Sequence, residues 1–477
     1  MKNIKFLSGL AVVVAAGLSL TGCKKDLGNN FDRSANAGIL AVRHIPTTSC
    51  GQLIDNVDGN ATDHIITLTS TDTWLLDSIT YVQPGYTLRI PAGTRIISGD
   101  ARTYSATDPI TGTTTTKSIK GVLVVTKGGK LESNGTAANP VVFTSANAAG
   151  SRKAGDFGGI ILLGRARTNW PDSTATRIEG LPTPGCGLSL TYGRQDATKD
   201  NDNSGSITYT RIEYPGLKLF NDNEINGLTL GGVGSGTTLD HIQVSYSADD
   251  SFEFFGGKVN ATYLVAAGGD DDDFDFDNGY TGTINFAVGL KAVNSSHSKS
   301  SSNPLLSDAN GIESDNNAAG TSTSLQTRPA LNHFTLLGFA SSTTKADTLK
   351  NNARLRRITS YNIQNSLLGG YPIGIAIENS SSGTLTNNLL HAYTAGGSVV
   401  PNSTVTSANS YLQLGSGTST SFYAGPTSAN YTTYSFNPDV LIPNASSPAG
   451  TTVGAIPSGT TAGSTWLAGW TDFNPQN

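Results

Sequence analysis

The stretch TTLDHIQVSYSADDSFEFFGGK (residues 237–258) carries the clearest pattern in the chain, because the next stretch, VNATYLVAAGGDDDDFDFDNGY (259–280), repeats it without a gap. Phe252 aligns with Phe274 and Phe254 with Phe276, each pair 22 residues apart. Alternate side chains of a β-strand point to one face, and stacked coils place like residues about 4.8 Å apart. The strands of a β-sandwich are not expected to repeat in the sequence at a fixed period. The sequence therefore predicts an all-β solenoid, a parallel β-helix of about 22 residues per coil.

A third line of the same length, TGTINFAVGLKAVNSSHSKSSS (281–302), extends the alignment. We expect the β-helix to span residues 61–400, after an N-terminal tether and cap in residues 23–60. A Ser/Thr-rich region, 401–477, follows, and its Trp466 and Trp470 are expected to form a C-terminal cap. The alignment predicts two apolar columns, with Ile242, Leu264 and Phe286 in the first and Val244, Ala266 and Val288 in the second.

The first residues have the features of an export signal. Lys2 and Lys5 form a basic region, and the apolar stretch 6–20 after them is too short to span a bilayer. The stretch is followed by LTGC (20–23), which resembles the lipobox of bacterial lipoproteins. The resemblance implies a signal peptide over residues 1–22, acylation of Cys23 and attachment to the membrane through lipid. We expect an outer membrane lipoprotein exposed at the cell surface.

The composition limits the partners. With 31 Lys and Arg against 36 Asp and Glu, the chain is slightly acidic and has no basic patch, so a nucleic acid partner is not expected. Cys50 and Cys186 are the only cysteines besides Cys23. In an oxidising compartment the two are expected to form a disulfide, with two free thiols as the alternative.

Several segments resemble those of a known group of proteins. They are GGIILLG (158–164), DNSGSITYTRIEYPG (202–216), the stretch 227–257, DDDFDFDNGY (271–280), GIESDNN (311–317) and GWTDFNPQ (469–476). These motifs look like those of large secreted lipoproteins of Bacteroidota and marine bacteria, which are interpreted as right-handed, pectin-lyase-like β-helices. The resemblance implies a right-handed parallel β-helix, and it implies no particular reaction.

The stretch GGDDDDFDFDNGY (268–280) places six aspartates within eight residues. Because the phenylalanines point inward, Ser251, Glu253, Asp273, Asp275 and Asp277 should point outward. If GIESDNN begins the next coil, Glu313 continues the row of Glu253 and Asp275, and Asp315 lies beside Asp277. The alignment also stacks Asp249 on Asp271 and Asp250 on Asp272.

Such stacking brings like charges together. Carboxylates about 5 Å apart repel by roughly 3 kcal/mol at an effective dielectric constant near 20. Some of them must therefore hold protons or bind cations. Calcium accepts six to eight oxygen ligands, and the stretch lacks the His and Cys that zinc prefers. We expect a calcium site with ligands among Asp249, Asp250, Glu253, Asp271, Asp272, Asp273, Asp275 and Asp277.

A second candidate for calcium is KDNDNSGSITY (199–209). Asp200, Asp202 and Ser204 alternate before Gly205, as in the first half of a calcium loop. The twelfth position from Asp200 is Arg211 and not a glutamate. A calcium loop and a plain Asx turn are both compatible with this pattern.

Three functions are compatible with these features. The first is a calcium-stabilised surface protein that binds extended ligands such as glycans or mediates adhesion. The second is a polysaccharide-degrading enzyme, for which Asp249 and Asp250 are the candidate catalytic residues of a glycoside hydrolase. A lyase would need a nearby basic residue, yet Arg354, Arg356 and Arg357 are expected several coils away. His241 is expected to point outward near the acids. The third function is a structural envelope lipoprotein.

Overall fold

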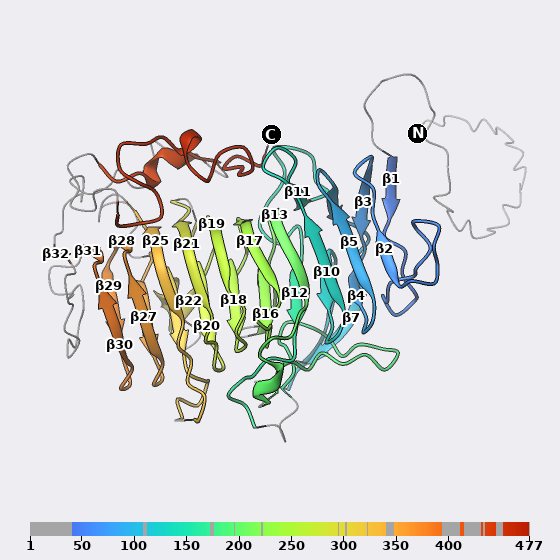
Figure 1. Ribbon diagram of the computed structural model, residues 1–477, viewed down its shortest axis with the longest axis horizontal. Coiled ribbons are helices and arrows are strands. Elements are labelled where there is room, and N and C mark those ends of the chain that lie inside the picture. The colour runs from blue at the N-terminus through green and yellow to red at the C-terminus, as the bar shows by residue number, and fades with distance from the viewer. Residues whose placement is uncertain are drawn as a thin grey trace, which may run out of the picture. The chain divides into compact units, whose positions relative to one another are not determined.

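The computed structural model confirms a right-handed parallel β-helix (Figure 1). The signal peptide, Cys23 and the residues up to Leu40 lie outside the described residues, as does much of 394–451. The described residues contain no helix long and apolar enough to cross a membrane. The structure describes residues 41–107, 112–171, 176–194, 196–220, 223–293, 295–300, 303–321, 323–339, 348–393, 411–414, 431–432, 435–444 and 452–476.

One side of each coil belongs to a sheet of nine parallel strands among the described residues. These strands are β4 (Ile79–Val82), β9 (Val122–Val125), β12 (Gly159–Leu163), β16 (Leu228–Gly231), β18 (Phe252–Phe255), β20 (Phe274–Asp277), β24 (Ile312–Asp315), β26 (Asn351–Arg356) and β29 (Ile373–Ile377).

The other two sides belong to a sheet of 17 described strands that bends at a corner. In each coil, the part of this sheet that precedes the corner in the sequence is called the first half. The part that follows the corner is called the second half. The strands are β1 (Ala41–His44), β2 (Ile65–Thr67), β3 (Asp72–Leu76), β5 (Thr87–Pro91), β6 (Arg95–Ser98), β10 (Lys130–Asn134), β11 (Val141–Thr144), β13 (Gly205–Glu213), β17 (Thr238–Ser245), β19 (Ala261–Ala267), β21 (Thr283–Leu290), β25 (Ala330–Leu337), β27 (Ser360–Gln364), β28 (Leu367–Tyr371), β30 (Ser382–Thr386), β31 (Leu389–Ala392) and β32 (Tyr411–Leu414).

Shorter elements project from the coils. Antiparallel pairs are formed by β7 (Arg102–Thr107) with β8 (Thr114–Ile119), β14 (Leu217–Phe220) with β15 (Asn223–Ile225), β22 (Lys299–Ser300) with β23 (Asn303–Ser307), and β33 (Tyr431–Thr432) with β34 (Ser435–Phe436). The described 3₁₀ turns are η1 (Ala197–Lys199), η3 (Pro438–Leu441) and η4 (Ala462–Ser464).

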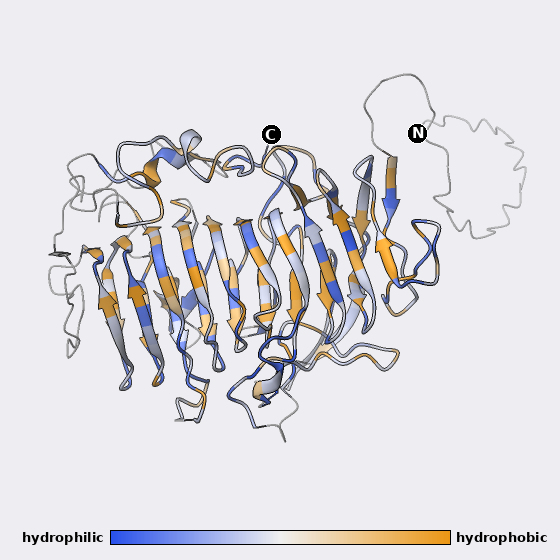
Figure 2. Cartoon of the chain, in the orientation of Figure 1, coloured by the Kyte–Doolittle hydropathy of each residue, from blue (hydrophilic) through white to orange (hydrophobic). Residues whose placement is uncertain are grey.

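The interior is a stack of like residues, as the repeat predicts. Phe252 pairs with Phe274, and their ring centroids lie 5.2 Å apart. Phe254 pairs with Phe276 at 5.1 Å, and all four rings are buried. Apolar and polar residues alternate along many of the strands (Figure 2).

The predicted columns hold for two lines and shift in the third. Ile242 pairs with Leu264, but Leu264 pairs with Ala287 and not with Phe286. In the second column, Val244 pairs with Ala266 as expected, whereas Val288 pairs with Val265. Six residues lie between Asp277 and Ile284, against five between their partners Phe255 and Ala261, so every later residue of β21 is moved by one position. The sequence alignment placed no gap there and was therefore wrong for the third line.

A row of aromatic residues, the corner row, occupies the bend between the two halves. Its members are Tyr209, His241, Tyr263, Phe286 and His333, and each has a positive φ between 44° and 58°. Successive rings stack at 4.2, 4.4, 5.2 and 4.8 Å. Left-handed backbone is uncommon for residues with a Cβ, so the stacking must help to stabilise it.

The end of the chain packs along the side of the coils. Trp470 contacts Tyr209 and His241, and Trp466 contacts Tyr263. The backbone of Asp472 forms two hydrogen bonds with Gln243. The two tryptophans were expected in a C-terminal cap, but the structure places them against coils in the middle of the β-helix.

This C-terminal segment, residues 435–444 and 452–476, covers outward-facing apolar residues of the second half. Val265, Val288 and Leu337 belong to a hydrophobic cluster that is separate from the interior core. Leu441, Ile456 and Trp470 of the C-terminal segment belong to the same cluster. The strands of the second half are therefore apolar on both faces, because one face packs against the interior and the other packs against this segment.

Replacing Trp470 by alanine should destabilise the protein by about 3–5 kcal/mol, because the indole is only 1 % exposed and its removal leaves a cavity against the corner row. Urea unfolding followed by circular dichroism measures this loss. The matched control is Leu305→Ala, since Leu305 is 87 % exposed and its removal should change stability very little. Equal stability of the two variants would contradict the packing role of Trp470.

Candidate metal centre

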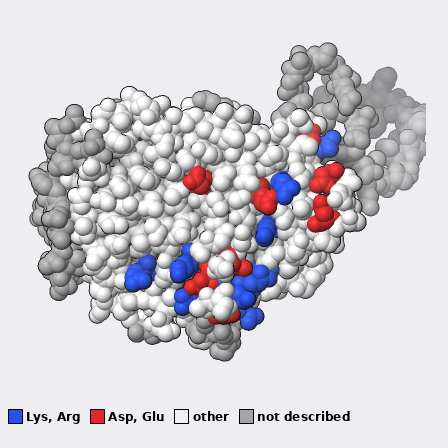
Figure 3. All heavy atoms as spheres, in the orientation of Figure 1, with Lys and Arg blue, Asp and Glu red and all other residues white. Residues whose placement is uncertain are grey.

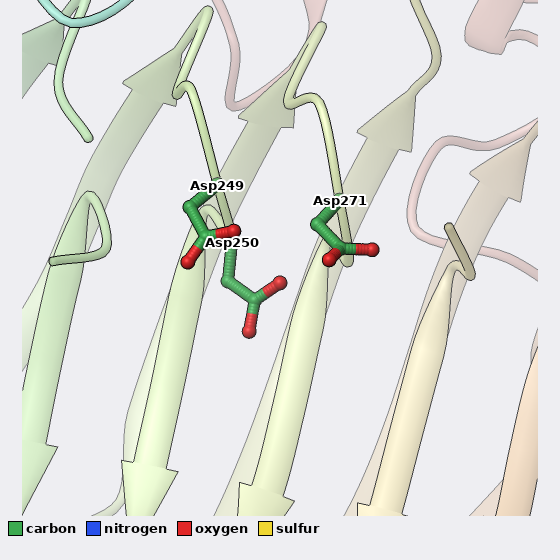
Figure 4. Close-up of side chains that lie close together, drawn as sticks. All are labelled: Asp249, Asp250 and Asp271. Atoms are coloured by element: carbon green, nitrogen blue, oxygen red, sulfur yellow. The ribbon is translucent and has the colours of Figure 1, made fainter. Parts of the chain in front are cut away.

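The acidic residues lie where each coil turns from the second half into the nine-stranded sheet. Asp249 and Asp250 come between β17 and β18, and Asp271 and Asp272 come between β19 and β20. Parallel pairing on both sides of the turn brings these residues together across neighbouring coils. Figure 4 shows Asp249 and Asp250 on one turn and Asp271 on the next.

Two sets of carboxylates come close enough to share a cation. Oxygen atoms of Asp249, Asp250 and Asp271 all lie within 4.8 Å of one another. Oxygen atoms of Asp250, Glu253 and Asp275 do so as well. Asp250 belongs to both sets, so the two candidate sites are adjacent. Five of the predicted ligands are thus brought together.

Hydrogen bonds tie these acids to neighbouring coils. Asp250 Oδ1 accepts from the backbone N–H of Asp272 at 2.8 Å, and Asp272 Oδ1 accepts from that of Asn310 at 2.6 Å. Asp272 therefore uses one oxygen to hold the next coil and lies outside both carboxylate sets. Asp277 also lies outside the sets, and its Oδ1 accepts from the backbone N–H of Asn278 at 2.6 Å.

A cavity of about 140 Å³ adjoins the acids. Covering segments supply part of its wall: the loop that carries Glu179, the β14–β15 pair, and the strand β22. The lining residues are Glu179, Lys218, Glu224, Asn226, Asp249, Asp250, Glu253, Asp271, Lys299 and Asp308.

Asn226 is a lining residue that the sequence reasoning missed. Its side chain is 1 % exposed, and Nδ2 donates to Glu253 Oε2. Its Oδ1 has no hydrogen-bond partner among the described residues. An amide oxygen in this position adds a neutral oxygen donor to the carboxylates. Nothing in its local sequence, NEINGLTL (223–230), distinguishes it from a turn asparagine.

Burial and like charge both raise the pKa values of the clustered acids. Burial is the largest cause for Asp249, Asp250 and Asp275, whose pKa values lie well above the usual range. Neighbouring carboxylates add to the shift, led by Glu224 for Asp249 and by Asp272 for Asp250. Burial raises the pKa of Asp271 to about 6, against the opposing effect of Lys291.

The outward row of the nine-stranded sheet changes from acidic to basic along the coils. Glu253 pairs with Asp275, Asp275 with Glu313, and Glu313 with Arg354. Arg354 Nη1 lies 3.4 Å from Glu313 Oε2. Arg354 lies on the strand next to that of Glu313, because the residues between β24 and β26 add no strand to this sheet. It is two strands from Asp275 and three strands from Glu253, which agrees with the expectation that it lies several coils from these acids.

A second outward row repeats this change of charge. Arg356 Nε lies 2.8 Å from Asp315 Oδ1, and Arg357 Nη1 lies 2.6 Å from Asp315 Oδ2. Burial raises the pKa of Asp277 to about 8, and the charge of Asp315 adds to the increase. Glu313 and Asp315 thus form ion pairs with basic side chains, whereas the acids of the two carboxylate sets form none within the part of the chain that the structure describes.

Asp273 does not point outward with the other acids, contrary to the expectation. It is fully buried and forms an ion pair with Lys291 at 3.1 Å. Lys291 is also fully buried, and its Nζ donates to the backbone oxygen of Asp271. Asp273 precedes β20, so the alternation within that strand does not extend to it. The sequence analysis overlooked Lys291, which follows β21 on another side of the coil.

The second candidate loop pairs with arginine side chains. Asp200 accepts from Arg167 Nε at 2.9 Å, and Asp202 Oδ2 accepts from the backbone N–H of Arg165 at 2.9 Å. Neither aspartate belongs to a described cluster of potential metal ligands. Both carboxylates hold the segment at Arg165 and Arg167.

His241 lies in the corner row and not beside the acidic cluster. Its ring stacks between those of Tyr209 and Tyr263, and Nδ1 contacts Asp240. The expectation that His241 would lie near the acids was wrong, because the corner is on another side of the coil from the turn that carries them.

A disulfide joins Cys50 and Cys186, whose Cα atoms are 6.2 Å apart. Cys186 belongs to the covering loop 176–194, which also carries Glu179. Ile178, Leu190 and Tyr192 of this loop pack in a hydrophobic cluster with outward residues of β9 and β12. The disulfide and this packing both hold Glu179 over the acids.

These features define a parallel β-helix protein with a buried acidic centre. The model of the pectate-lyase like beta helix domain matches residues 59–471, and the chain therefore belongs to that family. No curated protein and no solved structure matches the chain. The family match confirms the pectin-lyase-like β-helix that the sequence motifs implied.

Replacing Lys291 by methionine should destabilise the protein by roughly 3–5 kcal/mol, because Asp273 then remains buried without its partner. The double variant Asp273→Asn, Lys291→Met should recover much of this loss, since no unpaired charge is left. Urea unfolding of the two variants gives the comparison, with Lys130→Met as the exposed control. Equal losses in the single and double variants would contradict a buried ion pair.

Proposed function

We propose that the protein is a calcium-stabilised, lipid-anchored β-helix of the cell surface that binds extended ligands such as glycans. The observation that carries the calcium part is the pair of carboxylate sets that share Asp250. Carboxylate groups from two neighbouring coils meet there under covering loops.

The donors suit calcium. Both sets offer only oxygen ligands, and the Asn226 amide oxygen and water in the cavity could complete a coordination number of six to eight. Asp249, Asp250 and Asp271 would hold one ion, and Asp250, Glu253 and Asp275 a second. A bound cation would offset the repulsion that stacked carboxylates otherwise add to the folded state.

The anchor is supported by the N-terminal sequence. The lipobox LTGC (20–23) and the basic and apolar regions before it support acylation of Cys23. The Cys50–Cys186 disulfide is compatible with an oxidising compartment outside the cytoplasm. We therefore place the protein at the outer membrane, with the β-helix exposed at the cell surface.

Ligand binding is proposed to occur away from the acids. The cavity of about 140 Å³ suits ions and water better than a sugar chain, since ligand pockets usually measure roughly 300–1,000 Å³. The family and the stacked coils support an extended ligand on an outer face.

A second candidate function is degradation of a polysaccharide. It is favoured by the adjacency of Arg354 and Arg356 to the acidic row, since a lyase combines a cation-binding site with a basic residue. Both arginines are already paired with Glu313 or Asp315, which favours a structural role for them.

Removal of calcium should lower the melting temperature, because a ligand that binds only the folded state stabilises it. The stabilisation is about 2.7 kcal/mol when free calcium exceeds its Kd 100-fold. Differential scanning calorimetry with calcium and with chelator measures the difference. Asp250→Asn should abolish most of the calcium-dependent part, because Asp250 belongs to both carboxylate sets.

The matched control for this experiment is Asp200→Asn, since Asp200 pairs with Arg167 and not with the cluster. This variant should retain the full difference between calcium and chelator, whatever its own stability. A melting temperature that chelator leaves unchanged in the natural protein would refute the calcium proposal.

Calcium binding should release protons, and its affinity should fall as the pH is lowered through about 6, the raised pKa of Asp271. Burial and neighbouring carboxylates also raise the pKa values of Asp249, Asp250 and Asp275, so protons compete with calcium, which binds the charged forms of these groups. Isothermal titration calorimetry in two buffers of different ionisation enthalpy counts the released protons. Identical heats in both buffers would show that calcium does not bind at these carboxyls.

A further inference from the structure

The outward face of the first half is almost free of charge over several consecutive coils. The strands β19, β21, β25, β27 and β30 contain no Asp, Glu, Lys or Arg. Figure 3 views this face, and most of the described surface over these strands carries neither acidic nor basic side chains. The acidic centre and the basic residues that pair with it therefore do not extend onto this face.

A row of hydrogen-bonding side chains, the polar row, runs across these coils. Backbone pairing aligns Thr262 with Asn285, Asn285 with Asn332, Asn332 with Gln364, and Gln364 with Thr386. All five side chains are partly exposed. Adjacent members are spaced by the strand separation of about 4.8 Å. The amide Nδ2 of Asn332 donates to Asn285 Oδ1 at 3.0 Å, which fixes the orientation of these two groups.

The corner row borders the part of the polar row formed by Thr262, Asn285 and Asn332, whereas Gln364 and Thr386 are followed by Asn365 and Asn387. Tyr263, Phe286 and His333 each directly follow a member of the polar row, and all three are partly exposed. Because the rings stack on one another, they present their edges to the outside. Trp466 and Trp470 already pack against the end of the corner row formed by Tyr209, His241 and Tyr263. The same apolar border continues to Phe286 and His333.

We propose that this face binds an extended neutral polysaccharide whose chain runs along the axis of the coils. Hydroxyl groups of the polysaccharide would form hydrogen bonds with side chains of the polar row. The C–H groups of the sugar rings would pack against Phe286 and His333. The proposal specifies the extended ligand of the function proposed above and depends on it. An acidic polymer is disfavoured, because these strands offer no cation to pair with its charges.

The test uses affinity electrophoresis of the full chain in detergent, with hydroxyethyl cellulose as the neutral polymer and polygalacturonate as the acidic one. The natural protein should be retarded by hydroxyethyl cellulose and not by polygalacturonate. The double variant Asn285→Ala, Asn332→Ala should bind the neutral polymer about tenfold more weakly, because it removes two hydrogen-bonding groups. Thr103→Ala is the control, since Thr103 is exposed on the β7–β8 pair.

The variant Asn285→Lys distinguishes the effect of an added positive charge from the effect of losing a hydrogen-bonding side chain. It should weaken retention by hydroxyethyl cellulose and create retention by polygalacturonate. Unchanged retention of the alanine and lysine variants, or retention of the natural protein by polygalacturonate alone, would overturn the proposal. A dimer that Asn285→Lys dissociates, without retention by the neutral polymer, would assign the face to a second copy of the chain and also overturn it.

Failure of the two proposals can be told apart. Calcium should raise the melting temperature of all the face variants as it does that of the natural protein, since the polar row lies on another side of the coil from the acids. Unchanged retention by variants with a normal calcium response would refute the binding face alone. If hydroxyethyl cellulose still retards the natural protein but chelator does not change its melting temperature, only the calcium part of the proposal is refuted.

Discussion

Parallel pairing of one coil on the next is the constraint on which the rest of this structure depends. It places each side chain over its counterpart at the strand separation, whatever the chemistry of that side chain. For Phe252 and Phe274 the outcome is favourable, because buried rings stack in the interior. For Glu253 and Asp275 the same register brings together two carboxylates. The fold cannot have the first stack without the second, so the acids need protons, partners or cations.

The chain compensates for this stacked charge in different ways along the axis. Glu313 and Asp315 meet arginines from the adjacent strand β26. Asp273 meets Lys291 in the interior, where an unpaired charge would be costly. Among the described residues, no basic side chain forms an ion pair with Asp249, Asp250 or Asp275, and burial together with neighbouring carboxylates raises their pKa values. Charge without an ion pair is therefore concentrated in the two carboxylate sets and extends to Asp272 and Asp277, whose pKa values are also raised.

Covering segments are as important as the coils. The C-terminal segment buries outward apolar residues of the second half, and loop 176–194 buries those of the N-terminal coils of the nine-stranded sheet. Among the described residues, the first half is the side whose long outward face has no such hydrophobic cover. The three sides of the β-helix thus differ in what lies over them: an apolar segment, loops around an acidic cavity, and an open neutral surface.

The sequence by itself determined the repeat, and the repeat determined the class of fold. The sequence also predicted that Asp249 lies beside Asp271 and that Glu253, Asp275 and Glu313 form one row. These predictions hold because residues one period apart in the sequence pair with each other on neighbouring strands. The sequence could not place Phe286, because one additional turn residue is invisible to an alignment without gaps.

Only the tertiary structure decided which acids are free to share a cation. Lys291, Arg354 and Asn226 reach the acids from other strands and turns, and their distance along the chain says nothing about their distance in space. The same reason explains why the position of Trp466 and Trp470 could not be predicted from the sequence. An apolar chain end predicts a surface to cover, but whether that surface is the end or the side of a solenoid depends on where outward apolar residues gather in the folded coils.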